Sequence, residues 1–169
     1  MKYQLRPWKI SDLDHLITHA NNPEIAANMT DGFPYPYTRE HGQRFLEMAI
    51  QNPDRLFAII VNQEAVGGIG IHPLSDIQRK NAELGYWLAQ PYWNNGIISS
   101  AIIEVTTLAF QNFDINRFFA RPFGTNAASQ KALEKAGFKL EARLKNTFFK
   151  NGKFIDELIY SVRREEWKA

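Results

Sequence analysis

An apolar strand, a tight turn and a long amphipathic helix follow one another between residues 82 and 112, and this order constrains the fold most. Residues 82–88 are mostly apolar and end before Gln90-Pro91, which indicates a largely buried strand. Residues 97–112 carry apolar side chains at helical spacing, and residues 117–121 form a further short strand. A strand, a helix and a strand in this order predict a parallel βαβ unit, with a ligand in the crevice at the carboxyl end of the first strand.

The rest of the chain favours a mostly antiparallel sheet. Strands are expected at residues 5–8, 56–61, 65–71, 138–145 and 156–162, and helices at residues 12–20, 38–51 and 126–136. Ser11 is expected to cap the first of these helices. Residues 24–37 are of mixed character and end in an extended loop, and residues 150–153 turn between the last two strands. We therefore predict an α/β (α+β, three-layer) fold with a mixed, mostly antiparallel sheet, a central βαβ unit and flanking helices, in one domain over residues 1–169.

Composition narrows the chemistry. Hydrophobic residues make up 44% of the chain and charged residues 22%, so the chain is globular rather than disordered. The absence of cysteine excludes disulfides, a thiol nucleophile, iron–sulfur clusters and cysteine-ligated zinc. No stretch approaches the ~20 apolar residues that span a bilayer, and no apolar segment follows the basic residues at the start. A cytoplasmic protein without a membrane partner is expected.

Charge is unevenly distributed along the chain. Residues 1–116 carry a net charge of −4 and residues 117–169 a net charge of +6. The basic third could meet an anionic ligand, although solvated faces that happen to segregate explain the same pattern. No Lys/Arg-rich run is present, so nucleic acid is not an expected partner.

Asn94-Asn95-Gly96 joins the strand to the helix, and such a turn has two interpretations. The first N–H groups of a helix have no intrahelical partner, so the turn could cradle a phosphate, with Gly96 allowing close approach of the backbone. An ordinary turn is the alternative. No Walker A loop occurs, and a phosphoryl-transfer enzyme also lacks an obvious pair of metal-binding carboxylates. His15 and His19 have a zinc-like spacing but no evident third ligand, so no metal site is expected.

Glu83 lies within the otherwise apolar strand that leads into this turn. A buried charge is costly without a reason. The carboxylate could take a proton as a general base, or it could be a structural, salt-bridged glutamate.

Two motifs together identify a family. The strand, turn and helix over residues 83–100, followed by Asn126-x-x-Ser129 and by Leu133-Glu134-Lys135-Ala136-Gly137-Phe138, resemble the GNAT superfamily of acyl-CoA N-acyltransferases. Within that superfamily they are similar to the branch that contains ribosomal-protein-alanine N-acetyltransferases, and the resemblance covers nearly the whole chain. It implies that acetyl-CoA is a co-substrate and that the acceptor is a primary amine, on a peptide or a small molecule. Direct attack in a ternary complex is expected, because no cysteine is present to carry an acyl-enzyme.

The resemblance assigns roles to residues of this sequence. Glu83 would be the general base, and Ser129 would lie close to the sulfur of the cofactor. Ile98 stands where the family has a small Gly or Ala, and Trp93 where it has Gln or Arg. Cofactor-binding roles fall to the segments that match the motifs: Leu88, Ala89, Gln90, Asn94, Asn95, Gly96, Ile97, Ile98, Ser99, Asn126 and Ser129. The acceptor pocket would be formed by aromatic residues together with the base: Phe33, Tyr35, Tyr37, Glu83, Phe148 and Phe149.

Several alternatives stay open. The aromatic residues could simply pack their loops onto the core, and Asn126 could be only a helix cap. A non-catalytic acyl-CoA-binding or sensor module of the same fold is the alternative function. A peptide N-terminus, a free amino acid, a polyamine and an aminoglycoside are all possible acceptors, and the aromatic-rich loops are compatible with a homodimer.

Overall fold

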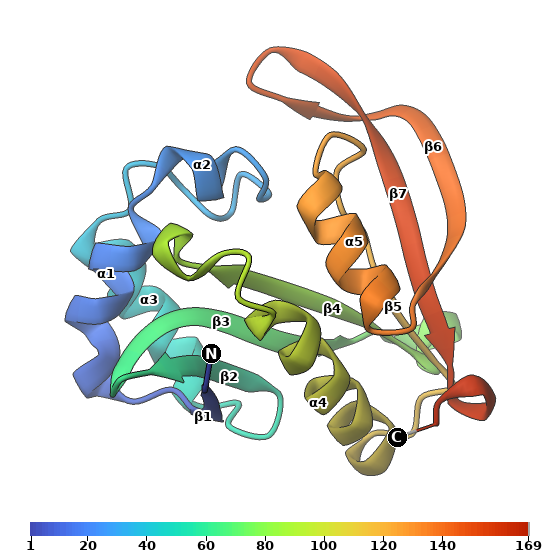
Figure 1. The fold of residues 1–169 in the computed structure, drawn as a ribbon, viewed down its shortest axis with the longest axis horizontal. Helices are drawn as coiled ribbons and strands as arrows, with labels where there is room; N and C mark the ends of the chain where they lie inside the picture. Colours follow the sequence, from blue (N-terminus) through green and yellow to red (C-terminus); the bar gives the residue numbers. More distant parts are fainter. Residues whose placement is uncertain (169) are drawn as a thin grey trace. The chain divides into compact units, whose positions relative to one another are not determined.

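A computed structural model describes residues 1–168 as an α/β protein with a seven-stranded mixed sheet, in the order β1-β2-β3-β4-β5-β7-β6 (Figure 1). The strands are β1 Gln4–Pro7, β2 Leu56–Val61, β3 Glu64–Pro73, β4 Asn81–Leu88, β5 Arg117–Ala120, β6 Lys139–Lys150 and β7 Lys153–Arg163. The helices are α1 Leu13–Ala20, α2 Pro23–Ala26, α3 Arg39–Ile50, α4 Ile97–Asn112 and α5 Ala127–Lys135. This architecture confirms the predicted fold class.

The predicted βαβ unit is present as β4, α4 and β5. Strands β4 and β5 pair in parallel, with Glu83 opposite Phe119, whereas β1–β2, β2–β3, β5–β7 and β6–β7 pair antiparallel. Helix α4 has the predicted bounds. Within residues 1–168, no helix combines the length and the apolar character needed to cross a membrane.

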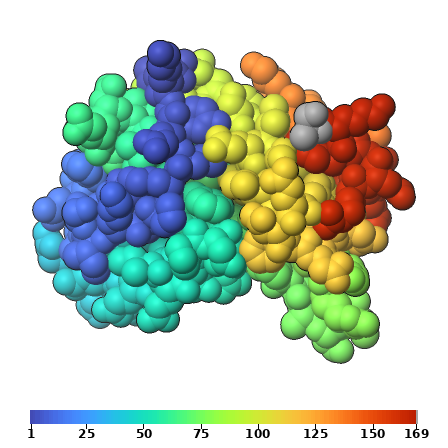
Figure 2. Space-filling model, turned by 90° about the horizontal axis from the view of Figure 1, so that it is seen from below, coloured from blue at the N-terminus to red at the C-terminus, as the bar shows by residue number. Residues whose placement is uncertain are grey.

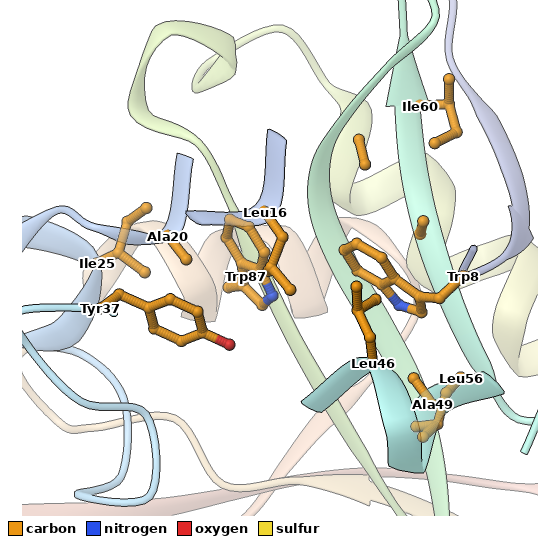
Figure 3. Close-up of a cluster of buried hydrophobic side chains, with 12 residues drawn as sticks. Trp8, Leu16, Ala20, Ile25, Tyr37, Leu46, Ala49, Leu56, Ile60 and Trp87 are labelled. Atoms are coloured by element: carbon orange, nitrogen blue, oxygen red, sulfur yellow. The ribbon is translucent and has the colours of Figure 1, made fainter. Parts of the chain in front are cut away.

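The chain divides into two compact units, and the first comprises residues 1–70 and 86–97. Its core contains side chains from β2 and β3, from α1, α2 and α3, from the end of β4, and Trp8, which follows β1. Trp8 meets Phe45 edge to face with ring centroids 5.2 Å apart, and Trp87 lies in the same cluster of buried side chains (Figure 3). Such burial of large apolar side chains is the main source of stability.

Two consecutive glycines in β3 allow β4 to approach closely. A Cβ atom added at Gly67 would lie 2.6 Å from the carbonyl oxygen of Trp87, and one added at Gly68 would lie 2.8 Å from the indole Nε1. The low side-chain bulk of this strand therefore makes room for a neighbouring backbone and its tryptophan.

The second unit comprises residues 71–85 and 98–169. Its long β6–β7 hairpin is prominent in Figure 1, and it turns at Asn151 and Gly152, which both have positive φ, as the sequence predicts. The loop between β3 and β4 protrudes as a green lobe in Figure 2 and carries Ile77, which is 88% exposed. Arg164 stabilises the end of α4, because its guanidinium donates to the carbonyls of Phe110, Phe113 and Ile115.

The prediction that Ser11 caps the first helix is wrong. Residues Ile10–Asp12 form a 3₁₀ turn and α1 begins at Leu13. Asp12 is buried and accepts two 2.7 Å hydrogen bonds from Arg6 and one of 2.9 Å from the amide of Lys9. An ion pair between residues six positions apart, which the helix-cap pattern does not reveal, therefore fixes this helix start.

Other element bounds also differ from those expected. Within the segment of mixed character, α2 forms because Asn22 accepts a hydrogen bond from the amide of Glu24 and Pro23 occupies the first turn. Strands β6 and β7 extend beyond their apolar cores, because main-chain pairing continues through exposed charged positions.

Candidate active site

In the first unit, the end of β4 and the turn that follows it are held by main-chain hydrogen bonds. Leu88 and Ala89 are buried, and the amide of Ala89 donates to the carbonyl of Val66 at 2.8 Å. The carbonyl of Leu88 accepts a 2.7 Å hydrogen bond from the indole of Trp93. The carbonyls of Ala89 and Gln90 accept from the amides of Tyr92 and Trp93. This segment is therefore a fixed platform rather than a loose loop.

The turn itself combines two left-handed residues with an exposed backbone. Asn94 has φ +61° and Gly96 has φ +75°, and residues 93–96 are exposed. A Cβ added at Gly96 would meet nothing within 4 Å, so the glycine is needed for its backbone conformation and not for space. Left-handed turn residues before a helix form concave anion sites. This geometry is compatible with the phosphate cradle predicted from the sequence.

Helix α4 begins directly after this turn. Its first residue, Ile97, is 2% exposed and anchors the helix start in the core. Ile98, which replaces a small residue of the family pattern, is half-buried, and Ser99 is buried. The main-chain N–H groups of the first helical turn therefore come directly after Gly96 in the sequence.

The turn is also braced from α1 and the residues that follow it. The side-chain amide of Asn22 donates to the Gln90 side-chain carbonyl at 2.9 Å. His19 lies edge-on to Tyr92, with centroids 6.1 Å apart, and its Nε2 is 3.3 Å from a Glu64 carboxylate oxygen. In residues 1–168, no group of three or more His, Asp or Glu side chains is arranged to hold a metal ion.

The three aromatic residues of the loop before α3 differ in placement. The ring centroid of Phe33 lies 5.2 Å from that of Tyr37 and 5.6 Å from that of Trp87. Tyr37 is 6% exposed in the same core cluster (Figure 3), and burial raises the pKa of its hydroxyl to about 12. Tyr35 is 54% exposed. Phe33 and Tyr37 thus pack the loop onto the core, whereas Tyr35 is available to a ligand.

In the second unit, Glu83 is part of a charged cluster. Its two carboxylate oxygens accept hydrogen bonds from Nε and Nη2 of Arg121 at 3.0 and 3.2 Å. Nη1 of the same guanidinium is 3.5 Å from a carboxylate oxygen of Glu157. The hydrogen bonds to Glu83 hold the pKa of Arg121 above its usual value, although burial opposes them. The salt-bridged arrangement considered for Glu83 is therefore present. A carboxylate in such a pair can still accept a further hydrogen bond.

Asn126 and Ser129 meet at the start of α5. The side-chain oxygen of Asn126 accepts a 3.1 Å hydrogen bond from the amide of Ser129, so the predicted helix cap is confirmed. This bond uses the amide oxygen of Asn126, which leaves its NH₂ group as the donor for a ligand. Ser129 is half-buried in the first turn.

Phe148 and Phe149 lie near the tip of the hairpin on opposite faces. Phe148 is half-buried, and its ring centroid lies 5.2 Å from that of Phe123. Phe149 is 63% exposed, and its ring centroid lies 5.1 Å from that of Phe154. Consecutive strand residues alternate between faces. These two rings therefore do not share one pocket wall.

Sequence reasoning missed Arg121 and Glu157. Glu157 carried little signal, because it follows Asp156 at the start of the expected strand and does not interrupt an apolar run as Glu83 does. Arg121 carried none, because its pairing depends on the register of β4 and β5.

Comparisons with known proteins agree with the motifs. Residues 2–139 match the family model of the acetyltransferase (GNAT) domain. The uncharacterized N-acetyltransferase p20 of Bacillus licheniformis is 26% identical over 167 residues, which cover 96% of this chain and 93% of p20. The uncharacterized N-acetyltransferase YoaA of Bacillus subtilis is 32% identical over 139 residues, 82% of this chain and 72% of YoaA. The solved structure of RimL, a ribosomal L7/L12 alpha-N-protein acetyltransferase in complex with coenzyme A, shares the fold. Its TM-score is 0.84 at 22% identity, over 96% of this chain and 94% of RimL.

Proposed function

Since the chain belongs to the GNAT acetyltransferase family, we propose that it transfers the acetyl group of acetyl-CoA to a primary amine by direct attack in a ternary complex. Family membership confirms the enzyme class that the motifs predict. Both compact units are taken as one acyl-CoA N-acyltransferase domain, because the family match over residues 2–139 runs through both.

The turn before α4 is the observation that supports a coenzyme A site. Backbone amides around Asn95, Gly96, Ile98 and Ser99 would bind the pyrophosphate, and the exposed left-handed turn fits that role. Main chain near Leu88 to Gln90 would pair with the pantetheine arm as an added strand, because each of these carbonyls keeps a second lone pair beside its internal hydrogen bond. The complex of RimL with coenzyme A supports the same ligand class.

Glu83 would carry the proton transfer, and Ser129 would assist the leaving group. Acetyl-CoA supplies an activated acetyl group as a thioester. An α-amino group has a pKa of about 7.7–8.0, so it is mostly protonated at neutral pH and must lose a proton before it attacks. Glu83 would accept that proton directly or through a water, and the hydroxyl of Ser129 would donate a hydrogen bond to the leaving thiolate. An acyl-cysteine intermediate is excluded, because the chain has no cysteine.

A thermal-shift and calorimetric titration with acetyl-CoA, CoA and ADP tests the cofactor. A ligand at 100 times its Kd adds about 2.7 kcal/mol to stability, a shift of several degrees for a domain of this size. Stabilisation by acetyl-CoA and CoA, with little from ADP, is expected. No stabilisation at millimolar acetyl-CoA would refute the proposed site.

The Glu83→Gln variant separates an enzyme from a non-catalytic acyl-CoA sensor of the same fold. It should bind CoA as the parent does, while turnover falls and its pH dependence steepens. Turnover is measured with a panel of candidate acceptors: a peptide with an N-terminal alanine, spermidine, free amino acids and an aminoglycoside. If the parent binds acetyl-CoA but acetylates no amine of this panel, the sensor function is favoured.

A further inference from the structure

The guanidinium of Arg121 lies between two glutamates from different strands. Glu83 comes from β4 and receives a two-pronged contact at 3.0 and 3.2 Å, whereas Glu157 comes from β7 and receives one contact at 3.5 Å. The side chain of Glu157 is 10% exposed, compared with 27% for Glu83 and 42% for Arg121. The cluster has a formal charge of −1.

The contact to Glu157 is weak for a buried carboxylate. Asp12, the other buried carboxylate of residues 1–168, accepts two 2.7 Å hydrogen bonds from Arg6 and a third from a main-chain amide. A buried charge needs close partners to offset its desolvation. Glu157 therefore depends on Arg121, which is already committed to both oxygens of Glu83.

Strand register fixes this arrangement. Glu83 is opposite Phe119 in the parallel pair, so Arg121, two residues further along, is on the same face just beyond the end of β5. On the other side, Phe123 forms a bridge with Glu157, and the amide of Gly124 donates to the carbonyl of Asp156 at 2.8 Å. The main chain on both sides of Arg121 is thus held in place.

We propose that Arg121 is a positioning residue for Glu83, and that the buried Glu157 draws part of the guanidinium charge away from that carboxylate. The inference rests on the proposed function, in which Glu83 is the general base. A two-pronged contact fixes the plane of the Glu83 carboxylate, because both of its oxygens are engaged by one rigid group. Each oxygen keeps a second lone pair, directed away from the guanidinium, that can accept from the amine or from a bridging water.

Other groups face Glu83 from the neighbouring strands. From β5 and its extension it meets Arg121, and from β7 the same guanidinium links it to Glu157. On the β3 side His72 lies against Gly85, which shares the face of Glu83, and a Cβ at Gly85 would come within 3.3 Å of its Nε2.

The decisive experiment follows the carboxyl carbon of Glu83 by NMR through an acid titration of the full-length ¹³C-labelled protein, with the signal assigned from Glu83→Gln. In Arg121→Gln the cluster charge becomes −2, so the titration midpoint of Glu83 should rise by about half a pH unit or more. In Glu157→Gln the cluster charge becomes zero, so the midpoint should fall by a similar amount. Opposite shifts are expected if the guanidinium of Arg121 and the carboxylate of Glu157 both act on Glu83 at close range, and a general loss of structure does not produce them.

Arg117→Gln is the matched control. Arg117 is on the same face of β5 and links Asn81 of β4 to Glu141 of β6, as Arg121 links its two glutamates. Arg117 is opposite Asn81, two residues before Glu83 in β4, and its guanidinium donates to Asn81 and Glu141 but not to Glu83. Because Arg117 has no hydrogen bond to Glu83, the Glu83 midpoint should rise less in this variant than in Arg121→Gln, and CoA binding by calorimetry verifies that each variant is folded.

Arg121→Lys separates charge from geometry, because lysine keeps the charge but lacks the planar fork. The midpoint should remain near that of the parent, while kcat for an alanine-terminated peptide or spermidine falls several-fold at constant KM. If the midpoints of Arg121→Gln and Glu157→Gln do not move in opposite directions, the inference is overturned even though acetyl-CoA binds. If they do move so but Glu83→Gln transfers acetyl as fast as the parent, the proposed base fails instead, and the positioning role fails with it.

Discussion

Replacing Gly67 with alanine should be among the most damaging small substitutions in the first unit. The added Cβ would lie 2.6 Å from the carbonyl oxygen of Trp87, and ordinary contacts begin at 3.4 Å, so β3 and β4 must separate locally by about 0.8 Å. Both sides resist, since Gly67 pairs with Ile59 in β2 and the adjacent Val66 accepts the amide of Ala89.

The magnitude follows from these two contacts. Overpacking against a rigid backbone costs about 1–3 kcal/mol, and weakening the hydrogen bond to Val66 adds about 1 kcal/mol. We expect Gly67→Ala to lower the free energy of unfolding by about 2–4 kcal/mol, which corresponds to roughly 5–15 °C in Tm. Because Ala89 leads into the turn before α4, affinity for CoA should fall as well.

Urea unfolding monitored by tryptophan fluorescence measures the loss, with calorimetry for CoA. Gly85→Ala in β4 is the control, because its Cβ would meet the His72 ring at 3.3 Å rather than backbone, and the ring can turn. That variant should lose less than about 1 kcal/mol. Equal losses in the two variants would refute the argument that backbone proximity at Gly67 is decisive.

Three further predictions concern other contacts. Trp93→Phe removes the 2.7 Å hydrogen bond to the Leu88 carbonyl, so the Kd for CoA should increase about three- to tenfold, or about 1 kcal/mol, in calorimetry, and an unchanged Kd would show that this bond does not hold the turn. Because burial raises the pKa of Tyr37 to about 12, the unfolded chain loses that proton first, and stability should fall by about 1–2 kcal/mol as pH rises from 10 to 12. Urea titrations of Tyr37→Phe should lack this part of the alkaline loss. Burial opposes ionisation of Asp12, but its hydrogen bonds with Arg6 and the Lys9 amide outweigh burial and lower its pKa, so its contribution is present above about pH 4 and is lost as pH falls. Asp12→Asn should therefore cost about 2–3 kcal/mol at pH 7 and much less at pH 2, and an equal cost at both would contradict the ion pair.

Helices, caps and turns of the fold could be predicted from the sequence where residue type and near neighbours determine them. Helix α4 has the predicted bounds, because a glycine of positive φ precedes it and its apolar side chains repeat at helical spacing. The cap at Asn126 and the turn at Asn151-Gly152 followed from residue type alone. The start of α1 was misplaced, because Asp12 is held by Arg6 rather than by its own helix.

Some features of the candidate site also follow from residue type alone, whereas others needed the structure. The turn at residues 94–96, the positions of Glu83 and Ser129 and the lack of a cysteine nucleophile can be established from the sequence, since each depends on residue type and near neighbours. The packing of Phe33 and Tyr37 onto Trp87 required the structure, and so did the opposite faces of Phe148 and Phe149.

The family and the chemistry it can perform were thus determined by the sequence, because its motifs are contiguous segments whose backbone conformation is set locally. The partners of its charged residues were decided by tertiary structure. Arg121 is 38 positions from Glu83 and 36 from Glu157, and the register of β4, β5 and β7 brings the three together. A shift of one residue in strand pairing would reverse the face of every side chain. Charge pairing in this protein is therefore a property of the assembled sheet.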